Sequence, residues 1–231
     1  MNLQIFPDIE VHLRRSGRAR QLTLRVSSLD GKVSLTAPNH AKTHQIKEFL
    51  RRKENWLREK RSQIPESVFV TFGTRLPFMG GEITVCGSSV RKVTLSNEKI
   101  LISEHSKRPG AQVGIFLKQY ARHLLEKKAA HYAEKLGKPF SKLSLRDTRS
   151  RWGSCSDRGA LMFSWRLIMA PVEVLEYVVA HEVAHLKHMN HSDQFWTEVK
   201  TLYGDYKFER HWLRENGSSL HQFQFYHWRL G

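Results

Sequence analysis

The most constraining feature of this sequence is a cluster of histidines between residues 181 and 191, which read H-E-V-A-H-L-K-H-M-N-H. The cluster begins with the pattern H-E-x-x-H at His181, Glu182 and His185. In a helix, residues four apart lie on one face, with Cβ atoms about 5–6 Å apart. Two imidazoles at that spacing can bind one Zn²⁺ ion, and Glu182 can act on a zinc-bound water as a general base. The preceding residues are apolar at helical spacing, so we expect the motif late in a buried helix.

A catalytic zinc site needs a third protein ligand and one open position. His191 follows His185 by six residues, as in the extended motif H-E-x-x-H-x-x-G-x-x-H. His188 stands where that motif has glycine, so we expect Asn190 to end the helix in a left-handed conformation. The sequence favours His191 as the third ligand.

Two glutamates on later helical turns, Glu198 and Glu209, are the alternative third ligands. A further helix is expected after the histidines, with Ser192 or Asp193 as its N-terminal cap and an apolar face that includes Phe195. A chance occurrence of H-E-x-x-H on a polar helix face is the competing interpretation, and the third histidine argues against it.

The chain has 231 residues, enough for one large or two small domains, with 40% hydrophobic and 26% charged residues. No apolar run reaches the ~20 residues needed to span a membrane, and residues 1–10 do not resemble a signal peptide. Cys86 and Cys155 are the only cysteines, too few for a disulfide scaffold. We therefore expect a cytoplasmic protein without a membrane partner.

The pattern of apolar residues predicts an α+β fold with two domains. Residues 1–105 are expected to form a β-rich basic domain with one amphipathic helix at 41–61, and residues 106–231 a metal-binding catalytic domain. A linker at 103–110 would separate them. Strands are expected within 8–37 (with a tight turn at Asp30 and Gly31), at 68–72, 82–86, 90–95, 100–102, 142–145 and 161–167, and a long helix at 112–136, capped by Gly137.

The net charge of +16 is concentrated in part on two clusters near the N-terminus. Arginines crowd residues 14–25, and a basic stripe follows the polar side of the expected helix at 41–61. Such surfaces attract nucleotides or nucleic acids through their phosphates, although a basic helix face is more often only solvated.

Several motifs together resemble the YgjP-like metallopeptidases, a family of metal-dependent hydrolases related to the WLM and SprT groups. The sequence has R-W-G-S-C at 151–155, A-P at 170–171, Y-V-V-x-H-E-x-x-H-L from Tyr177 and N-H-S-x-x-F-W from Asn190. A weaker likeness covers the run R-S-x-R-A-R from Arg15 to Arg20. Val183 departs from the family pattern, where leucine is usual.

The resemblance implies a minimal zincin-like helical core with a short sheet and a peptide or protein as substrate. It implies a zinc site of His181, His185 and His191, with Glu182 as the catalytic acid and base. It also implies that an edge strand before the metal helix, expected at 161–167, pairs with an extended substrate. Cys155 would then have a structural role.

Zinc at this site would lower the pKa of a bound water to about 7 and polarise the scissile carbonyl. The candidates for stabilising the resulting oxyanion are His188, Tyr203, Tyr206 and Arg151. Two alternative functions remain at this point: a metal-dependent nucleotide pyrophosphatase, for which the sequence has no Gly-rich phosphate loop, and a protease acting on nucleic-acid-associated proteins. A purely structural zinc is disfavoured, because such sites usually have four protein ligands.

Overall fold

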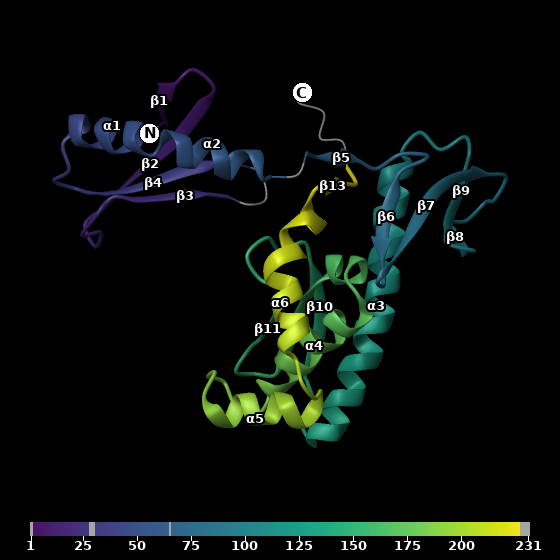
Figure 1. The fold of residues 1–231 in the computed structure, drawn as a ribbon. Coiled ribbons are helices and arrows are strands. Elements are labelled where there is room, and N and C mark those ends of the chain that lie inside the picture. The colour runs from purple at the N-terminus through teal and green to yellow at the C-terminus, as the bar shows by residue number, and fades with distance from the viewer. Residues whose placement is uncertain (1, 28–30, 65, 227–231) are drawn as a thin grey trace. The chain divides into compact units, whose positions relative to one another are not determined.

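The chain forms two compact units, Met1–Glu66 and Ser67–Gly231, in a computed structural model that describes residues 2–27, 31–64 and 66–226 (Figure 1). The α+β class is as expected. The division at residue 66, however, lies well before the boundary expected after residue 105. Each unit has its own apolar core, and each is described by itself below.

The first unit is a four-stranded sheet covered by two helices. Its strands are β1 (Asn2–Phe6), β2 (Ile9–Ser16), β3 (Thr23–Val26) and β4 (Val33–Pro38), in the order β1-β2-β4-β3. Alternate residues of β2, namely Ile9, Val11 and Leu13, are buried while their neighbours are exposed. This two-residue period gives the sheet one apolar face, which packs with Ile46 and Leu50 of the helices.

The single amphipathic helix expected at 41–61 is in fact two helices, α1 (Thr43–Arg52) and α2 (Glu54–Ser62). Lys53 separates them with φ −97° and ψ 5°, outside helical geometry. Arg58 and Arg61 tie α2 to Asp8, through an ion pair of 2.7 Å and a hydrogen bond of 3.0 Å to its carbonyl. Of the expected turn at Asp30 and Gly31, Asp30 lies outside the described residues, whereas Gly31 has the φ of 68° that favours glycine.

The second unit begins with short strands: β5 (Val68–Phe69), β6 (Arg75–Phe78), β7 (Gly81–Ser88), β8 (Thr94–Ser96) and β9 (Lys99–Ser103). The last four form a sheet in the order β6-β7-β9-β8. Helix α3 (Pro109–Leu136) follows and ends at Gly137, which has φ 70° as a left-handed cap. Ile83, Val85 and Ile100 share one core with Val113 and Leu117 of α3. That shared core explains why residues 67–105 belong with the helical part of the chain.

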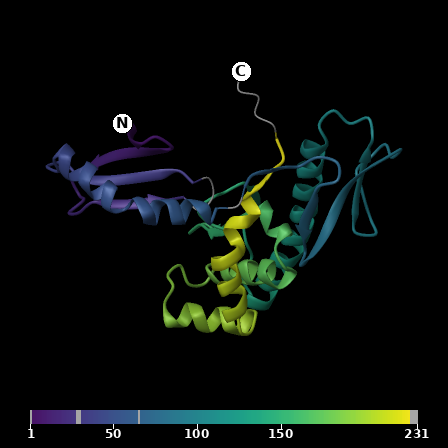
Figure 2. The ribbon, with the colours of Figure 1, turned by 45° about the horizontal axis from the view of Figure 1, so that its top comes forward.

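The remaining elements surround the histidine cluster. They are β10 (Lys142–Arg146), β11 (Gly153–Cys155), β12 (Ala160–Ser164), the 3₁₀ helix η1 (Trp165–Met169), α4 (Val172–Ala184), α5 (Asp193–Leu202), α6 (Lys207–Asn216), the 3₁₀ helix η2 (Gly217–His221) and β13 (Phe223–Gln224). Helices α5 and α6 both pack on α4 (Figure 2). No described helix is long and apolar enough to cross a membrane.

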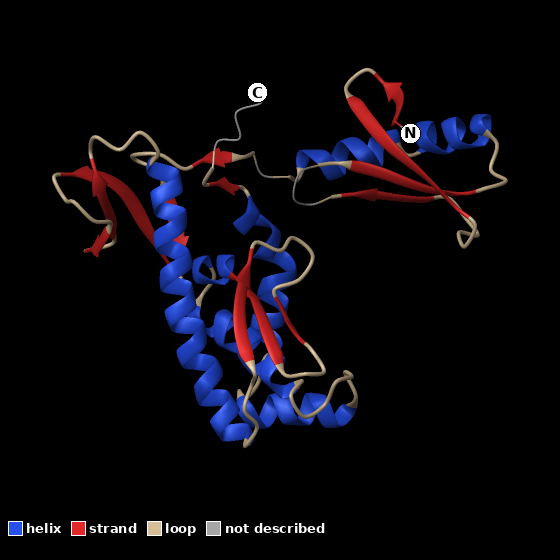
Figure 3. Ribbon diagram, turned by 180° about the vertical axis from the view of Figure 1, so that it is seen from behind, coloured by secondary structure: helices blue, strands red, loops and turns tan. Residues whose placement is uncertain are grey.

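Strands β10, β12 and β11 form a sheet in that order, and one face of it lies against the helices (Figure 3). Strand β12 runs parallel to β10 and antiparallel to β11. The expectation that residues 161–167 form an edge strand is therefore wrong, because β12 is central and ends at Ser164, where η1 begins. The edge strands are β10 and β11.

Candidate metal centre

Helix α4 places the first two residues of the motif. It begins after Pro171, whose fixed φ suits a helix start, and Val174, Leu175 and Val178 are among its many buried residues. The helix ends at Ala184, so His181 and Glu182 lie in its last turn and His185 at its C-terminal cap, with φ −65° and ψ −18°. Because His185 keeps helical dihedrals, its ring remains on the same face as that of His181.

The segment between α4 and α5 brings His191 back to the first two histidines. Asn190 is not left-handed, contrary to expectation, since the helix has already ended six residues earlier. The side-chain hydroxyl of Ser192 accepts a hydrogen bond of 3.5 Å from the amide of Phe195 and caps α5, as expected. This cap fixes the start of α5 directly after His191.

His181, His185 and His191 form one cluster in which a ligand atom from each lies within 4.8 Å of the others. The Nε2 atoms of His181 and His191 are 3.2 Å apart. His185 is buried, His181 is half-buried and His191 is exposed, so the cluster opens to solvent on one side. The structure thus brings together all three histidines that the sequence predicts as ligands.

Two aromatic residues of α5 support the three rings. The ring of Phe195, which is fully buried, lies 4.9, 4.4 and 4.8 Å from those of His181, His185 and His191. Trp196 stacks on His191 at 5.6 Å. Because aromatic packing restricts how far a ring can rotate, the imidazoles are held in place by their surroundings.

A hydrogen bond fixes the tautomer of His185. Its Nδ1 atom lies 2.9 Å from the carbonyl oxygen of His188, which can only accept. Nδ1 must therefore carry the proton, which leaves the lone pair of Nε2 free. His188 contributes through its backbone, at the position where the extended motif has glycine.

Burial keeps two of the imidazoles neutral. It lowers the pKa of His181 to about 3, with smaller contributions from the other two histidines and from Arg210. Burial also lowers the pKa of His185, partly opposed by the bond to His188. Neutral imidazole is the form that binds a metal ion, so both rings are ready to act as ligands at neutral pH.

Glu182 is buried and faces β11. Burial raises the pKa of its carboxyl group to about 8, and the nearby Arg151 partly opposes this shift. Gly153 lies against it so closely that a Cβ atom added there would be 2.5 Å from Cγ of Glu182. A glycine is therefore needed for β11 to approach the helix, and this approach shields Glu182 from water.

The two alternative third ligands are engaged elsewhere. Glu198 forms an ion pair of 2.7 Å with Lys187 and lies 3.7 Å from His188. The carboxylate of Glu209 is 2.9 Å from the hydroxyl of Tyr203. Neither belongs to the cluster of possible ligand atoms.

Of the four candidates for stabilising an oxyanion, two have side chains that are already engaged with glutamates. The side chain of His188 lies against Glu198, and the hydroxyl of Tyr203 is held by Glu209. The ring of Tyr206 is stacked between those of Tyr177 and Trp196, at 5.6 and 5.3 Å, and its hydroxyl bonds to no described residue. Tyr206 and Arg151 are the two candidates that remain available.

The sequence places Phe195 on the apolar face of a helix but does not show that it packs against the three histidines, and it gives no role to Gly153 or Arg210 at the site. Arg210 lies over the ring of Trp196 at 4.9 Å, and its charge reaches His181. The role of Gly153 depends on how β11 meets α4, which no local pattern reveals.

Cys155 follows on the same strand and is half-buried. Burial raises the pKa of its thiol to about 11, and the neighbouring Glu182 adds to the shift. The thiol is therefore protonated at neutral pH, and it donates a hydrogen bond of 3.3 Å to the carbonyl of Ser156. A protonated thiol is a poor nucleophile and ligand, which agrees with a structural role.

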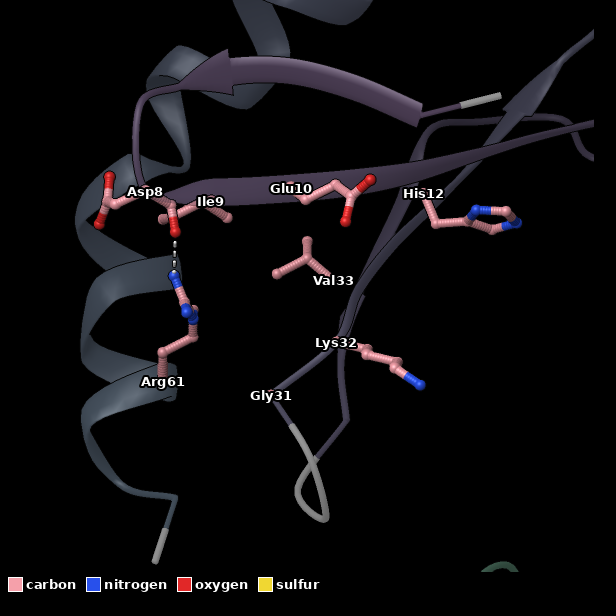
Figure 4. A pocket seen from close by; sticks show the side chains of 8 residues that line it. All are labelled: Asp8, Ile9, Glu10, His12, Gly31, Lys32, Val33 and Arg61. Carbon is pink, nitrogen blue, oxygen red and sulfur yellow. Dashed lines mark hydrogen bonds between the residues drawn. The ribbon is translucent and has the colours of Figure 1, made fainter. Parts of the chain in front are cut away.

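The first unit has a hollow of its own, of about 600 Å³, between β2 and α2 (Figure 4). Residues of both charges line it, among them Asp8, Glu10, Lys32 and Arg61. Arg61 is already bonded to the carbonyl of Asp8. These mixed charges do not indicate a binding site for either anions or cations.

A helix with two histidines four residues apart, a glutamate between them and a third histidine from the next segment is the arrangement of a metal-dependent hydrolase. The sequence comparison agrees: the model of the YgjP-like metallopeptidase domain matches residues 20–216. The chain belongs to this family and is a metallopeptidase, and the family implies a metal ion.

Two solved structures of archaeal metallopeptidase zymogens resemble parts of the chain. Abylysin from Pyrococcus abyssi has 23% sequence identity, with a TM-score of 0.36, over 40% of this chain and 92% of its own. Jannalysin from Methanocaldococcus jannaschii has 16% identity, with a TM-score of 0.35, over 41% and 96%. No curated protein matches the sequence.

Proposed function

We propose that the protein is a zinc-dependent peptidase in which His181, His185 and His191 hold the ion and Glu182 is the general base. The observation that carries this proposal is the convergence of three imidazole ligand atoms within 4.8 Å. The 3.2 Å between two Nε2 atoms is close to the ~3.3 Å that tetrahedral zinc with Zn–N distances of about 2.0–2.1 Å requires. Three nitrogen donors also match a catalytic rather than a structural zinc site.

When bound, zinc would polarise the scissile carbonyl of the substrate and lower the pKa of a bound water to about 7. Glu182 then takes the proton of the attacking water and delivers it to the leaving amine. Its pKa of about 8 applies to the site without a cation, and a nearby positive charge favours the ionised carboxylate that a base must be. The close approach of Gly153 to Glu182, together with the buried residues of α4, keeps bulk water away from this carboxylate.

The free edge of β11 is the surface on which we propose that the substrate aligns. The amide of Ser164 donates to the carbonyl of Trp152, and the amide of Ser156 donates to the carbonyl of Ala160. In an antiparallel pair only every second residue bonds to the partner strand, so residues 152, 154 and 156 are the ones directed at β12. The main-chain groups of Gly153 and Cys155 consequently point away from β12. An extended peptide could pair with them beside Glu182.

The test of this proposal replaces Glu182 with Gln in zinc-loaded protein. The amide preserves the size of the side chain but cannot accept a proton, so we expect full zinc content and a ~10²–10⁴-fold loss of peptide hydrolysis. The measurement compares turnover of a casein-derived peptide library by parent and Glu182→Gln proteins, with and without chelator. Nucleoside triphosphates are assayed in parallel.

Parental turnover by zinc-loaded Glu182→Gln protein would exclude Glu182 as the base. Cleavage of nucleoside triphosphates but of no peptide would replace the peptidase by a metal-dependent pyrophosphatase acting at the same site.

A further inference from the structure

One face of the sheet β10-β12-β11 is turned away from the helices (Figure 3). Residues of this sheet and of the loop before β11 line a hollow of about 470 Å³. Its floor is a row of half-buried residues in register across the three strands: Ser144, Met162 and Ser154. Side chains alternate along a strand, so Gly153 and Cys155 face the helices while Ser154 between them faces this hollow. The hollow and the metal centre therefore lie on opposite faces of the same strand.

Four cationic side chains surround the hollow, and none of the described residues that line it is acidic. Lys142 lies at one end, and Arg146, Arg149 and Arg151 lie at the other. Arg151 is at the border between the two faces, because its charge also acts on Glu182. No acidic residue in the described part of the chain forms an ion pair with Lys142, Arg146 or Arg151. Like charges gathered around one hollow repel one another, and a bound anion removes that repulsion.

The loop that carries two of these arginines is anchored at both ends. Asp147, at its start, pairs at 2.6 Å with the buried Arg166, which also donates to the carbonyls of Leu220 and Phe223. The hydroxyl of Thr148 donates to the carbonyl of Arg151 at 2.8 Å. Asp147 is engaged with Arg166 and does not line the hollow, and the two anchors restrain the backbone of the loop that carries Arg149 and Arg151.

We propose that this hollow binds acidic side chains of the peptide substrate and so gives the enzyme a preference for Asp or Glu near the scissile bond. The proposal rests on the peptidase function above and on pairing of the substrate with β11. In a peptide that extends the sheet at β11, alternate side chains lie on the face of Ser154. An acidic side chain on that face lies beside the hydroxyl of Ser154, at the edge of the hollow that Lys142, Arg146 and Arg151 line without forming an ion pair to a described residue.

The position of the hollow favours a peptide over a nucleic acid. Its floor includes Ser154 of the strand that would align the substrate, and its cations lie around one hollow and do not form a stripe. A nucleic-acid backbone presents phosphates at regular intervals and is usually matched by an extended basic stripe.

The experiment measures binding without turnover, using zinc-loaded protein with Glu182→Gln. Labelled peptides differ only by Glu, Gln or Lys at one position, which is scanned along the peptide, and Kd is measured by fluorescence anisotropy at low salt. In this Glu182→Gln background, one variant carries Lys142→Gln with Arg146→Gln. The matched control carries Lys99→Gln with Lys127→Gln, at exposed positions elsewhere in the unit. A third variant reverses the charges with Lys142→Glu and Arg146→Glu.

We expect the background protein to bind the best Glu peptide about tenfold more tightly than its Gln counterpart, with a preference that weakens as salt rises. The ratio should fall towards one in Lys142→Gln with Arg146→Gln and stay tenfold in the control. Charge reversal should give a preference for Lys peptides, which mere structural damage would not produce.

An equal affinity for all Glu and Gln pairs would overturn the proposal, as would a preference that survives the loss of Lys142 and Arg146. A single-stranded DNA oligonucleotide is tested as a competitor. If it displaces the Glu peptide, binds more tightly than that peptide and loses this affinity when Lys142 and Arg146 are replaced, the hollow is a nucleic-acid site instead. If the parent protein cleaves no peptide while the Glu preference still depends on Lys142 and Arg146, the acidic-peptide site is supported and the peptidase function is contradicted.

Discussion

Gly153 shows how one residue can determine whether the carboxylate of Glu182, the proposed general base, is shielded from water. The close contact between β11 and Glu182 exists only because residue 153 has no side chain. The same contact excludes water from Glu182 and contributes to the burial that raises its pKa to about 8. The local backbone does not require a glycine at 153, since its φ is not positive, so the close approach is the reason for it.

We expect Gly153→Ala to lower peptide hydrolysis by ~10²-fold or more while zinc content is kept. The added methyl group would displace the carboxylate, and poor placement of a general base costs most of its contribution. Forcing a methyl group into a close-packed site should also cost about 1–3 kcal/mol of stability. Turnover and thermal unfolding of the variant would be compared with those of Gly81→Ala, where an added Cβ meets nothing closer than 3.8 Å. Parental turnover in Gly153→Ala would show that Glu182 does not need this contact.

Sequence spacing was enough to predict that His181, His185 and His191 lie together, because helix geometry and a short connection restrict where they can go. It could not predict Phe195 as the residue that packs against all three rings, since that depends on how α5 meets α4. The pKa values of His181 and Glu182 were equally out of reach. They follow from burial, which is decided by residues distant in the sequence.

At the scale of elements, the sequence predicted strands near β10 and β12, whereas the edge position of β12 was an implication of the family resemblance and was wrong. An apolar run such as 161–167 indicates a buried strand, and burial says nothing about which strands flank it. The short strand β11 was not predicted, because three residues containing glycine carry almost no strand signal. The break between α1 and α2 was also not predicted, because a single residue with non-helical dihedrals, Lys53, leaves no mark in an otherwise helical pattern.

His221, in η2, gives a test of how the C-terminal elements pack on the site. Its ring lies 5.5 Å from that of Trp152, directly before Gly153. Burial lowers its pKa from 6.5 to about 4, with Arg166 adding to the shift, Asp147 opposing it and Arg149 adding a smaller contribution. The folded protein therefore binds fewer protons at this residue than the unfolded chain does between pH 4 and 6.5.

It follows that the contribution of neutral His221 to stability is complete above pH 6.5 and is lost as the pH falls towards 4, by up to about 3 kcal/mol. We expect the difference in free energy of unfolding between parent and His221→Gln proteins to change by that order between pH 7 and pH 4.5, with the parent losing more. Guanidinium denaturation followed by tryptophan fluorescence would measure it. A difference that is the same at both pH values would show that His221 is not buried in its neutral form.

At the scale of the whole molecule, the sequence indicated two parts but not where they divide. The change from strands to helices near residue 105 suggested a boundary, whereas the apolar residues of β6, β7 and β9 in fact complete the core around α3. Secondary structure changes are visible in a sequence, but shared cores depend on tertiary packing. The basic residues expected on the surface of the first unit include Lys47, Arg51 and Arg52 of α1, which are all exposed.

If this basic surface binds nucleic acid, the affinity should fall steeply with salt as counterions are released. Replacing Arg51 and Arg52 with Gln should reduce the slope of log K against log salt by about 1–2. Fluorescence anisotropy with a labelled DNA duplex would measure this slope, with Lys99→Gln and Lys127→Gln in the second unit as control. Undetectable binding at low salt would leave these residues as a solvated helix face.

The central claim is that three histidines hold one zinc ion, and the metal content of the purified protein tests it most directly. We expect one zinc per chain in the parent by mass spectrometry, and a large loss in His191→Ala, which removes one of three ligands. His188→Ala is the control, because that residue contributes to the cluster through its backbone carbonyl and should keep its zinc. Full zinc content in His191→Ala would move the third ligand to Glu198 or Glu209, and a parent protein that binds no zinc would contradict the claim itself.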